Sequence, residues 1–103
     1  MAQKTYAGVT VDVTEEGYMT NPSQWTKEIG AAIAQEENII LTDTHFAVIE
    51  FIRNRAQKGD ALTIRSVGNS GIVDIKGFYT LFPGAPMKKA AKIAGLMKPA
   101  SCV

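Results

Sequence analysis

The hydrophobic pattern of this chain changes its period once, at Asn21-Pro22. Before this point, Val9, Val11 and Val13 alternate with polar residues, which is the period-two pattern of a half-buried strand. After it, apolar residues recur at helical spacing almost to the end of the chain. We therefore expect an α+β fold that is mainly α, with an N-terminal β-hairpin or meander over residues 3–19 and then about five short helices.

Capping residues and helix breakers indicate where the expected helices begin and end. Asn21-Pro22 resembles an N-cap followed by a proline at the first helical position, and Thr42 and Asp60 can cap later helices. The helix after Thr42 is apolar over most of its circumference, which places it at the centre of the domain. Gly95 is suited to end the last helix in a left-handed cap. The expected helices are residues 22–36, 43–58, 61–67, 72–81 and 86–94.

Length and composition favour one packed domain over residues 1–103, since 46% of the residues are hydrophobic and 20% are charged. No apolar run approaches the roughly 18 residues that a membrane-spanning helix needs, and the first residues lack the hydrophobic stretch of a secretory signal. One cysteine fits a reducing cytoplasm and excludes a disulfide framework or a cysteine-rich zinc site. We therefore expect a cytoplasmic protein with no membrane partner and no bound metal or organic cofactor.

The single cysteine, Cys102, is the next-to-last residue, in a tail that has no hydrophobic periodicity. Terminal residues are usually mobile and solvated, so we expect residues 96–103 to form a mobile arm that carries an exposed thiol. A thiol acts as a nucleophile only as the thiolate, and an ordinary cysteine is mostly protonated at neutral pH. Activation must then come from the pocket that receives the arm, which suits a carrier better than a self-contained enzyme. The alternative is that Cys102 is an incidental tail residue.

The part of the chain after Asp74 contains lysines but no further acidic side chain. Such a basic segment could steer the protein toward an acidic partner protein or an RNA backbone, or it could be a solvated helix face. Its lysines are Lys76, Lys88, Lys89, Lys92 and Lys98.

Two other residues could carry chemistry but also have simpler interpretations. His45, the single histidine, falls in the first turn of an apolar helix, so a helix-start or core-edge role is favoured over that of a base. Arg65 could order the arm, bind an anion or form a surface ion pair. The tandem helices offer no polar recognition helix, because the central one is apolar where exposed polar side chains are needed. Direct nucleic acid binding is therefore not expected.

Several motifs are specific enough to suggest a family. One group leads into the cysteine and consists of Leu81-Phe82-Pro83-Gly84-Ala85-Pro86, Lys92-Ile93-Ala94-Gly95-Leu96, Lys98-Pro99 and Cys102. An earlier group consists of Glu16-Gly17-Tyr18, Trp25, Leu41-Thr42, His45-Phe46, Val48-Ile49 and Ile64-Arg65. Together they resemble the DsrC/TusE family over almost the whole chain, although Phe46 stands where that family has tryptophan.

This resemblance implies a small helical domain with an N-terminal hairpin and a mobile arm whose penultimate cysteine carries sulfur, at most as a sulfurtransferase. In the TusE branch, the resemblance implies a persulfide donor of the TusBCD or DsrEFH type and delivery for 2-thiolation of the tRNA wobble uridine. In the DsrC branch, also called the gamma subunit of dissimilatory sulfite reductase, the arm inserts toward the sirohaem site and accepts sulfur. Partner docking or arm ordering would fall to Arg65, Lys88, Lys89, Lys92 and Lys98.

Departures from the family pattern narrow the expected function. Ala91 occupies the position of the second arm cysteine of full DsrC proteins, so this chain cannot form their internal disulfide or trisulfide. A one-cysteine persulfide relay, in tRNA thiolation or a related sulfur-transfer pathway, is therefore favoured. An accessory partner of sulfite reductase and a regulatory or nucleic-acid-binding module remain as alternatives. Met97 and Ser101 replace the proline and glycine common in the family, and the segment between Arg65 and Lys76 is shorter than usual.

Overall fold

The N-terminal residues form a β-hairpin from strands β1 (Ala2–Tyr6) and β2 (Val9–Val13). The structure, a computed structural model, describes residues 2–99. The antiparallel strands are joined by Ala7 and Gly8, whose φ angles of 53° and 78° suit the right-handed twist of a two-residue hairpin. Met19 returns to β2 as a single bridge. The expected hairpin is confirmed, with the meander reduced to this one bridge.

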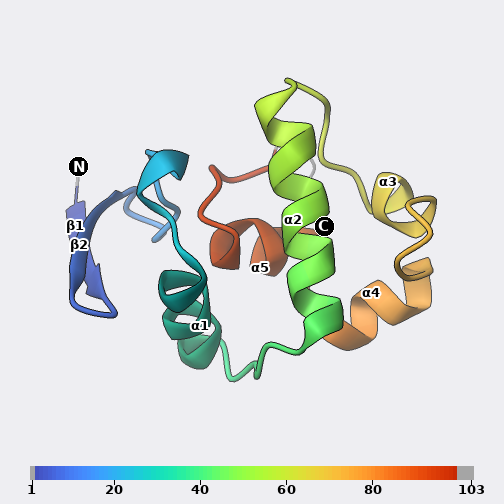
Figure 1. Ribbon diagram of the computed structural model, residues 1–103, viewed down its shortest axis with the longest axis horizontal. Helices are drawn as coiled ribbons and strands as arrows, with labels where there is room; N and C mark the ends of the chain where they lie inside the picture. Colours follow the sequence, from blue (N-terminus) through green and yellow to red (C-terminus); the bar gives the residue numbers. More distant parts are fainter. Residues whose placement is uncertain (1, 100–103) are drawn as a thin grey trace.

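Helical structure follows the hairpin, and Figure 1 shows how the helices are arranged. Within residues 2–99, a short 3-10 helix, η1, precedes five α-helices. Their bounds are Pro22–Gln24 for η1, Lys27–Glu36 for α1, Asp43–Gln57 for α2, Ile64–Gly68 for α3, Ile75–Leu81 for α4 and Pro86–Ile93 for α5. The α+β, mainly α architecture is therefore confirmed.

Three of the expected helix starts were wrong, because the chain uses a later N-cap in each case. The helix expected from Pro22 is divided, and Thr26 caps α1. Helix α3 begins after Thr63 instead of Asp60, and α4 begins after Asp74. Each of these caps accepts a hydrogen bond from the amide three residues further along, which satisfies a donor that the helix itself leaves free.

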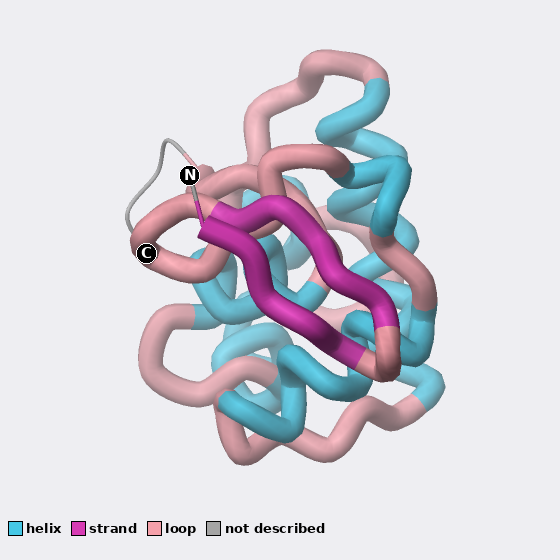
Figure 2. Tube along the Cα trace, turned by 90° about the vertical axis from the view of Figure 1, so that its left-hand side faces the viewer, coloured by secondary structure: helices cyan, strands magenta, loops and turns pink. Residues whose placement is uncertain are grey.

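The apolar core lies among the hairpin, α1, α2, α4 and α5. Helix α2 crosses the middle of the molecule as expected (Figure 1), but Phe46 and Phe51 on it are only partly buried. Helix α5 is enclosed more completely, because it packs against α1, α2 and α4. Its small residues Ala90 and Ala91 are fully buried and allow this close approach. The hairpin covers one side of the helices, next to α1 (Figure 2).

His45 joins the start of α2 to the end of α4 at the edge of the core. Its Nδ1 accepts the Thr42 amide N–H at 3.1 Å, and its Nε2 lies 2.8 Å from the Leu81 carbonyl oxygen. Its ring also meets that of Phe82 edge-on, with centroids 5.1 Å apart. The side chain is 6% exposed. The interpretation of His45 as a helix-start residue at the edge of the core is therefore confirmed.

Candidate functional site

Helix α5 ends in a left-handed glycine cap, and the C-terminal segment begins there. Gly95 has a φ of 71°, which is the conformation that such a cap requires. The Leu96 amide donates to the Ala91 carbonyl at 2.9 Å, and the Gly95 amide donates to the Lys92 carbonyl at 3.2 Å. The predicted helix end at Gly95 is confirmed, and Leu96 is buried immediately after it.

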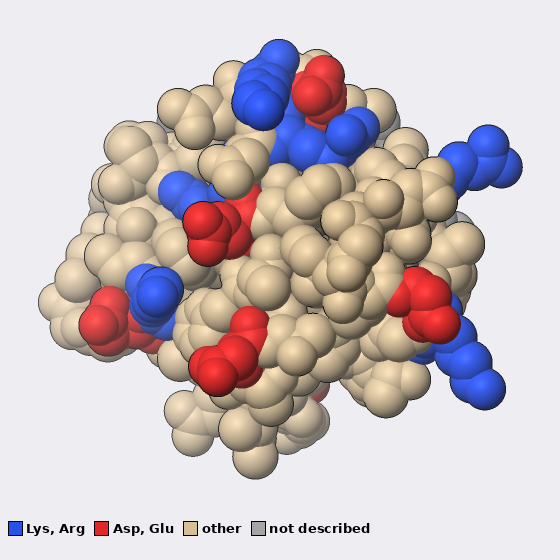
Figure 3. Space-filling model, turned by 45° about the vertical axis from the view of Figure 1, so that its right-hand side comes forward, with Lys and Arg blue, Asp and Glu red and all other residues tan. Residues whose placement is uncertain are grey.

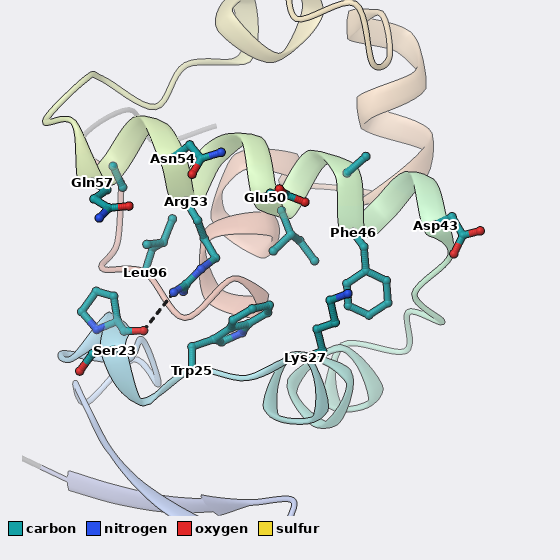
Figure 4. Close-up of a pocket in the computed structure, with 14 residues that line it drawn as sticks. Ser23, Trp25, Lys27, Asp43, Phe46, Glu50, Arg53, Asn54, Gln57 and Leu96 are labelled. Carbon is teal, nitrogen blue, oxygen red and sulfur yellow. Dashed lines mark hydrogen bonds between the residues drawn. The ribbon is translucent and has the colours of Figure 1, made fainter.

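The next two carbonyls of this helix end are bound by side chains from other elements. The Trp25 indole Nε1 donates to the Ile93 carbonyl at 2.7 Å, and Arg53 Nη1 donates to the Ala94 carbonyl at 2.6 Å. Arg53 Nη2 also donates to the Pro22 carbonyl at 3.1 Å, shown as a dashed line in Figure 4. The guanidinium carbon lies 4.4 Å from the centroid of the Trp25 ring. We call Trp25 and Arg53 together the exit clamp.

Two glycines leave room for the indole of the exit clamp. A Cβ atom at Gly30 would lie 2.8 Å from Trp25 Cζ2, and one at Gly95 would overlap the indole more severely. The indole is thus held between the backbone of α1 and the backbone that follows α5. Arg53, beside it, is half-buried, and this burial lowers the pKa of its guanidinium from the usual value. The exit clamp is therefore a packed, partly desolvated unit.

An open groove of about 760 Å³ lies beside the exit clamp, between α2 and the chain that joins η1 to α1 (Figure 4). At its other end, the Lys27 ammonium lies 5.6 Å from the centroid of the Phe46 ring. A second hollow, of about 510 Å³, is lined by residues 60–63 and 96–99. Leu96 lines both, so the start of the C-terminal segment lies between them.

The described part of the expected arm, residues 96–99, lies against the body of the protein. Leu96 and Pro99 are buried, and the exposed Lys98 forms an ion pair with Glu16 at 3.0 Å. The candidate thiol, Cys102, lies outside the described residues, together with the rest of the expected arm beyond Pro99.

The other candidate residues are distributed over α3, α5 and the C-terminal segment. Arg65 is exposed on α3 and has no ion pair among residues 2–99. Lys88 and Lys89 are partly exposed on α5, and within the same range no carboxylate lies at ion-pair distance from either. Lys92 pairs with Glu37 at 3.3 Å. Figure 3 shows basic and acidic side chains interspersed over one face, without a continuous basic patch there.

Sequence reasoning missed both members of the exit clamp. Trp25 is expected from its spacing to belong to the apolar stripe of the first helix, and Arg53 to complement the negative end of the second helix dipole. The available signal was that Trp25 is the single tryptophan and that Arg53 lies on the helix expected at the centre of the domain. Neither feature shows which backbone carbonyls these side chains reach.

Within the described range, no group of three or more metal-ligating side chains is close enough to hold a metal ion. No helix there combines the length and the apolar character that crossing a membrane requires.

Comparisons with known proteins agree on one family. The model of the family described as "DsrC like protein" matches residues 5–103. The sulfurtransferase TusE homolog of Haemophilus influenzae is 36% identical, over 93% of this chain and 95% of its own length. Sulfurtransferase TusE of Photorhabdus laumondii is 32% identical over the full length of both chains.

Solved structures with the same fold include two DsrC proteins. DsrC of Allochromatium vinosum superposes with a TM-score of 0.81 at 31% identity, covering 98% of this chain and 97% of that one. The oxidized gamma-subunit of the dissimilatory sulfite reductase (DsrC) from Archaeoglobus fulgidus gives 0.82 at 28% identity, covering 99% and 100%.

The described residues have a DsrC-like fold, which consists of the hairpin, the five α-helices and a C-terminal segment that follows α5. The family is one of sulfur-relay proteins, and the matches extend over nearly the whole chain. The chain therefore belongs to the DsrC/TusE family.

Proposed function

We propose that this protein is a TusE-type sulfur carrier in which Cys102 receives sulfur as a persulfide from one protein and delivers it to another. The observation that carries this proposal is the extent of the family match, which runs through the chain to residue 103 and includes Cys102. The relatives cited above are sulfurtransferases of the TusE type, and this chain matches them over nearly their whole length. Cys102 is also the single thiol of the chain, so no other residue could hold the sulfur in this way.

Persulfide transfer needs no external oxidant or reductant. The Cys102 thiolate attacks the outer sulfur of the donor persulfide, and a new S–S bond forms as the donor S–S bond breaks. The donor leaves as a thiolate, and Cys102 becomes the persulfide. An acceptor thiolate then attacks the outer sulfur, takes it as its own persulfide and releases the Cys102 thiolate. Each step conserves sulfur, protons and electron pairs.

Ala91 supports a relay that is completed on another molecule. Its side chain is fully buried in the core on α5, and the chain has no second cysteine that could receive sulfur internally. The donor would be a complex of the TusBCD or DsrEFH type, and the acceptor a tRNA-thiolating enzyme in the cytoplasm. Neither step calls for a metal or an organic cofactor.

Lys88 and Lys89 are the leading candidates for docking to an acidic face of such a partner. Their charges are not paired with carboxylates among residues 2–99, whereas Lys92 and Lys98 already pair with Glu37 and Glu16. Arg65 remains a weaker candidate for steadying the arm, because it is exposed on α3.

A role beside dissimilatory sulfite reductase is the second candidate function. The observation in its favour is the close superposition on DsrC structures, one of which is described as the gamma-subunit of that enzyme. In this role, Cys102 would have to work without a partner cysteine. Stable association with purified sulfite reductase, and no transfer to a tRNA-thiolating enzyme, would favour the second candidate over the first.

Mass spectrometry of the intact protein tests the carrier function. The protein is reduced and incubated with glutathione persulfide, and its intact mass is then measured. The Cys102→Ala variant is treated in parallel. We expect the wild type to gain one sulfur atom and the variant to gain none, because only the thiol can form the new S–S bond. Failure of the reduced wild type to gain sulfur from this and from protein-bound persulfide donors would overturn the proposal.

A further inference from the structure

We infer that Trp25 and Arg53 are positioning residues that set the direction in which the segment carrying Cys102 leaves the protein. The structural part of this inference is independent of what Cys102 does. Its consequence for sulfur transfer rests on the proposed function.

The end of α5 is covered both by its own backbone and by side chains from other elements. The last carbonyls of an α-helix have no partner within the helix, and the glycine cap satisfies those of Ala91 and Lys92. The carbonyls of Ile93 and Ala94, next to the exit, are bound by the exit clamp. A cap made only by its own backbone could turn as a unit, whereas these two bonds tie it to α2 and to the chain before α1.

The hydrogen bonds that Arg53 makes are strong and depend on the shape of its guanidinium. Hydrogen bonds from a charged donor are stronger than neutral ones, and the Arg53 bond to the Ala94 carbonyl is short, at 2.6 Å. The planar guanidinium reaches two carbonyls at once while it stacks on Trp25, which a lysine ammonium cannot do. No carboxylate within residues 2–99 forms an ion pair with Arg53. The charge of Arg53 is therefore directed at backbone carbonyls, including that of Ala94 at the end of α5.

Only a short stretch of chain separates the backbone held by the exit clamp from the thiol. Cys102 follows Gly95 by only seven residues, which span at most about 25 Å when fully extended. Transfer between two sulfur atoms requires near-contact, on the order of 3–3.5 Å, in a defined orientation. A rotation at Gly95 would shift residues 96–99, which form the described base of the segment that carries the thiol, and would thereby change where this segment starts relative to a partner.

Fluorescence resonance energy transfer can detect a change in this direction as a change in distance, because the chain has one tryptophan and one cysteine. Trp25 serves as the donor, and an acceptor dye attached to Cys102 reports the distribution of distances. The test variant is Arg53→Lys, which keeps the charge and loses the planar fork. We expect its distance distribution to shift or broaden relative to the wild type, with donor-only samples correcting for changes in Trp25 itself.

Arg55→Lys is a matched control on the same helix. The Arg55 guanidinium donates to the Ala61 carbonyl at 2.8 and 3.1 Å and lies 5.8 Å from the Phe51 ring centroid, and it forms no hydrogen bond to α5 or to residues 95–99. We expect the wild-type distance distribution in this variant. A variant that only lost stability would lower the melting temperature without moving the distribution. An unchanged distribution in folded Arg53→Lys would overturn the inference.

Amide hydrogen exchange gives a second measurement, which also allows Trp25 to be varied. In Trp25→Phe, the ring remains but the indole donor to Ile93 is lost. We expect the Leu96 amide to exchange at least about tenfold faster in Trp25→Phe and Arg53→Lys than in the wild type, since each lacks a bond that opposes opening of the cap. Wild-type exchange at Leu96 in both variants would contradict the inference.

The two proposals can fail separately. Dye labelling and hydrogen exchange do not depend on sulfur transfer. If the wild type took no sulfur from glutathione persulfide, the inference about the exit clamp would therefore be unaffected. Conversely, we expect the Trp25, Arg53 and Arg55 variants to take up as much sulfur from this small donor as the wild type, because a freely diffusing reagent does not require a particular direction of the arm.

Discussion

Gly95 meets two requirements at once. Its φ of 71° is strained for any residue with a Cβ atom, and a Cβ there would also overlap the Trp25 indole. Gly59 follows α2 in a similar conformation, with a φ of 78°, but a Cβ there would meet nothing within 4 Å. Comparing the two glycines therefore separates two losses of stability that a Cβ atom would cause. One comes from the left-handed backbone conformation, and the other from the clash with the Trp25 indole.

Replacing each glycine by alanine tests this difference. Gly59→Ala should lower the free energy of unfolding by about 1–2 kcal/mol, the cost of the left-handed conformation alone. Gly95→Ala should lower it further, by at least about 1 kcal/mol, because the indole must move as well. Urea unfolding followed by circular dichroism measures both values. Equal losses would show that Trp25 does not press on this backbone.

His45 is expected to stabilise the fold without taking part in sulfur chemistry. Because its Nδ1 accepts the Thr42 amide proton, its proton lies on Nε2 and is donated to the Leu81 carbonyl. His45→Phe keeps a ring but leaves both partners without a bond, so the free energy of unfolding should fall by about 1–3 kcal/mol. Sulfur uptake from glutathione persulfide at a temperature where the variant is folded should be unchanged. Lost uptake in the folded variant would contradict this assignment.

At the scale of elements, the hairpin is joined to α1 by polar contacts at the edge of the core. The Tyr6 hydroxyl donates to a Glu36 carboxylate oxygen at 3.1 Å, and Lys4 pairs with the same carboxylate at 3.2 Å. Burial raises the pKa of the Tyr6 hydroxyl, and it also raises the pKa of Tyr18 in the turn after β2. Lys4 has a raised pKa too, chiefly through its interaction with Tyr6 and against the effect of burial.

These shifts predict that the fold loses stability in alkaline solution. The folded protein holds the Tyr6 and Tyr18 protons to higher pH than the unfolded chain does, so the free energy of unfolding falls as pH rises beyond about 10, the ordinary tyrosine pKa. Lys4, whose pKa is also raised, acts in the same direction. Urea unfolding between neutral and strongly alkaline pH measures the decline.

Two tyrosine variants identify the source of this decline. Tyr6→Phe should make it shallower, because the buried hydroxyl can no longer ionise in either state. Tyr79→Phe is the control, since Tyr79 is 42% exposed on α4. An equal effect of both variants would assign the alkaline loss to general charge repulsion instead of to burial.

At the scale of the whole molecule, the exit of the C-terminal segment is built from three distant parts of the chain. Trp25 reaches Ile93 across 68 positions of sequence, and Arg53 reaches Ala94 across 41. Helix α5 lies among α1, α2 and α4, so its end can be contacted from several elements. The fold thus holds the base of the C-terminal segment from two sides.

Local signals predicted the parts of the fold that depend on neighbouring residues. The alternating valines, the Thr42 cap, the start of α5 at Pro86 and its end at Gly95 are read from a few adjacent positions. The break before α1 was missed, because Trp25 combines a helical spacing with contacts to Ile93 and Gly95. Trp25, which makes those remote contacts, has an extended backbone conformation. Helix α1 therefore begins only after Thr26, which is its N-cap.

By itself, the sequence determined the hairpin, the approximate helices, the family and a single thiol at the end of the chain, because each rests on residue identity and local spacing. Only the tertiary structure decided that an indole and a guanidinium bind the last carbonyls of α5. A periodic pattern shows which face of a helix is apolar, but not which distant donor meets which backbone acceptor. That pairing depends on how the packed helices approach one another in three dimensions.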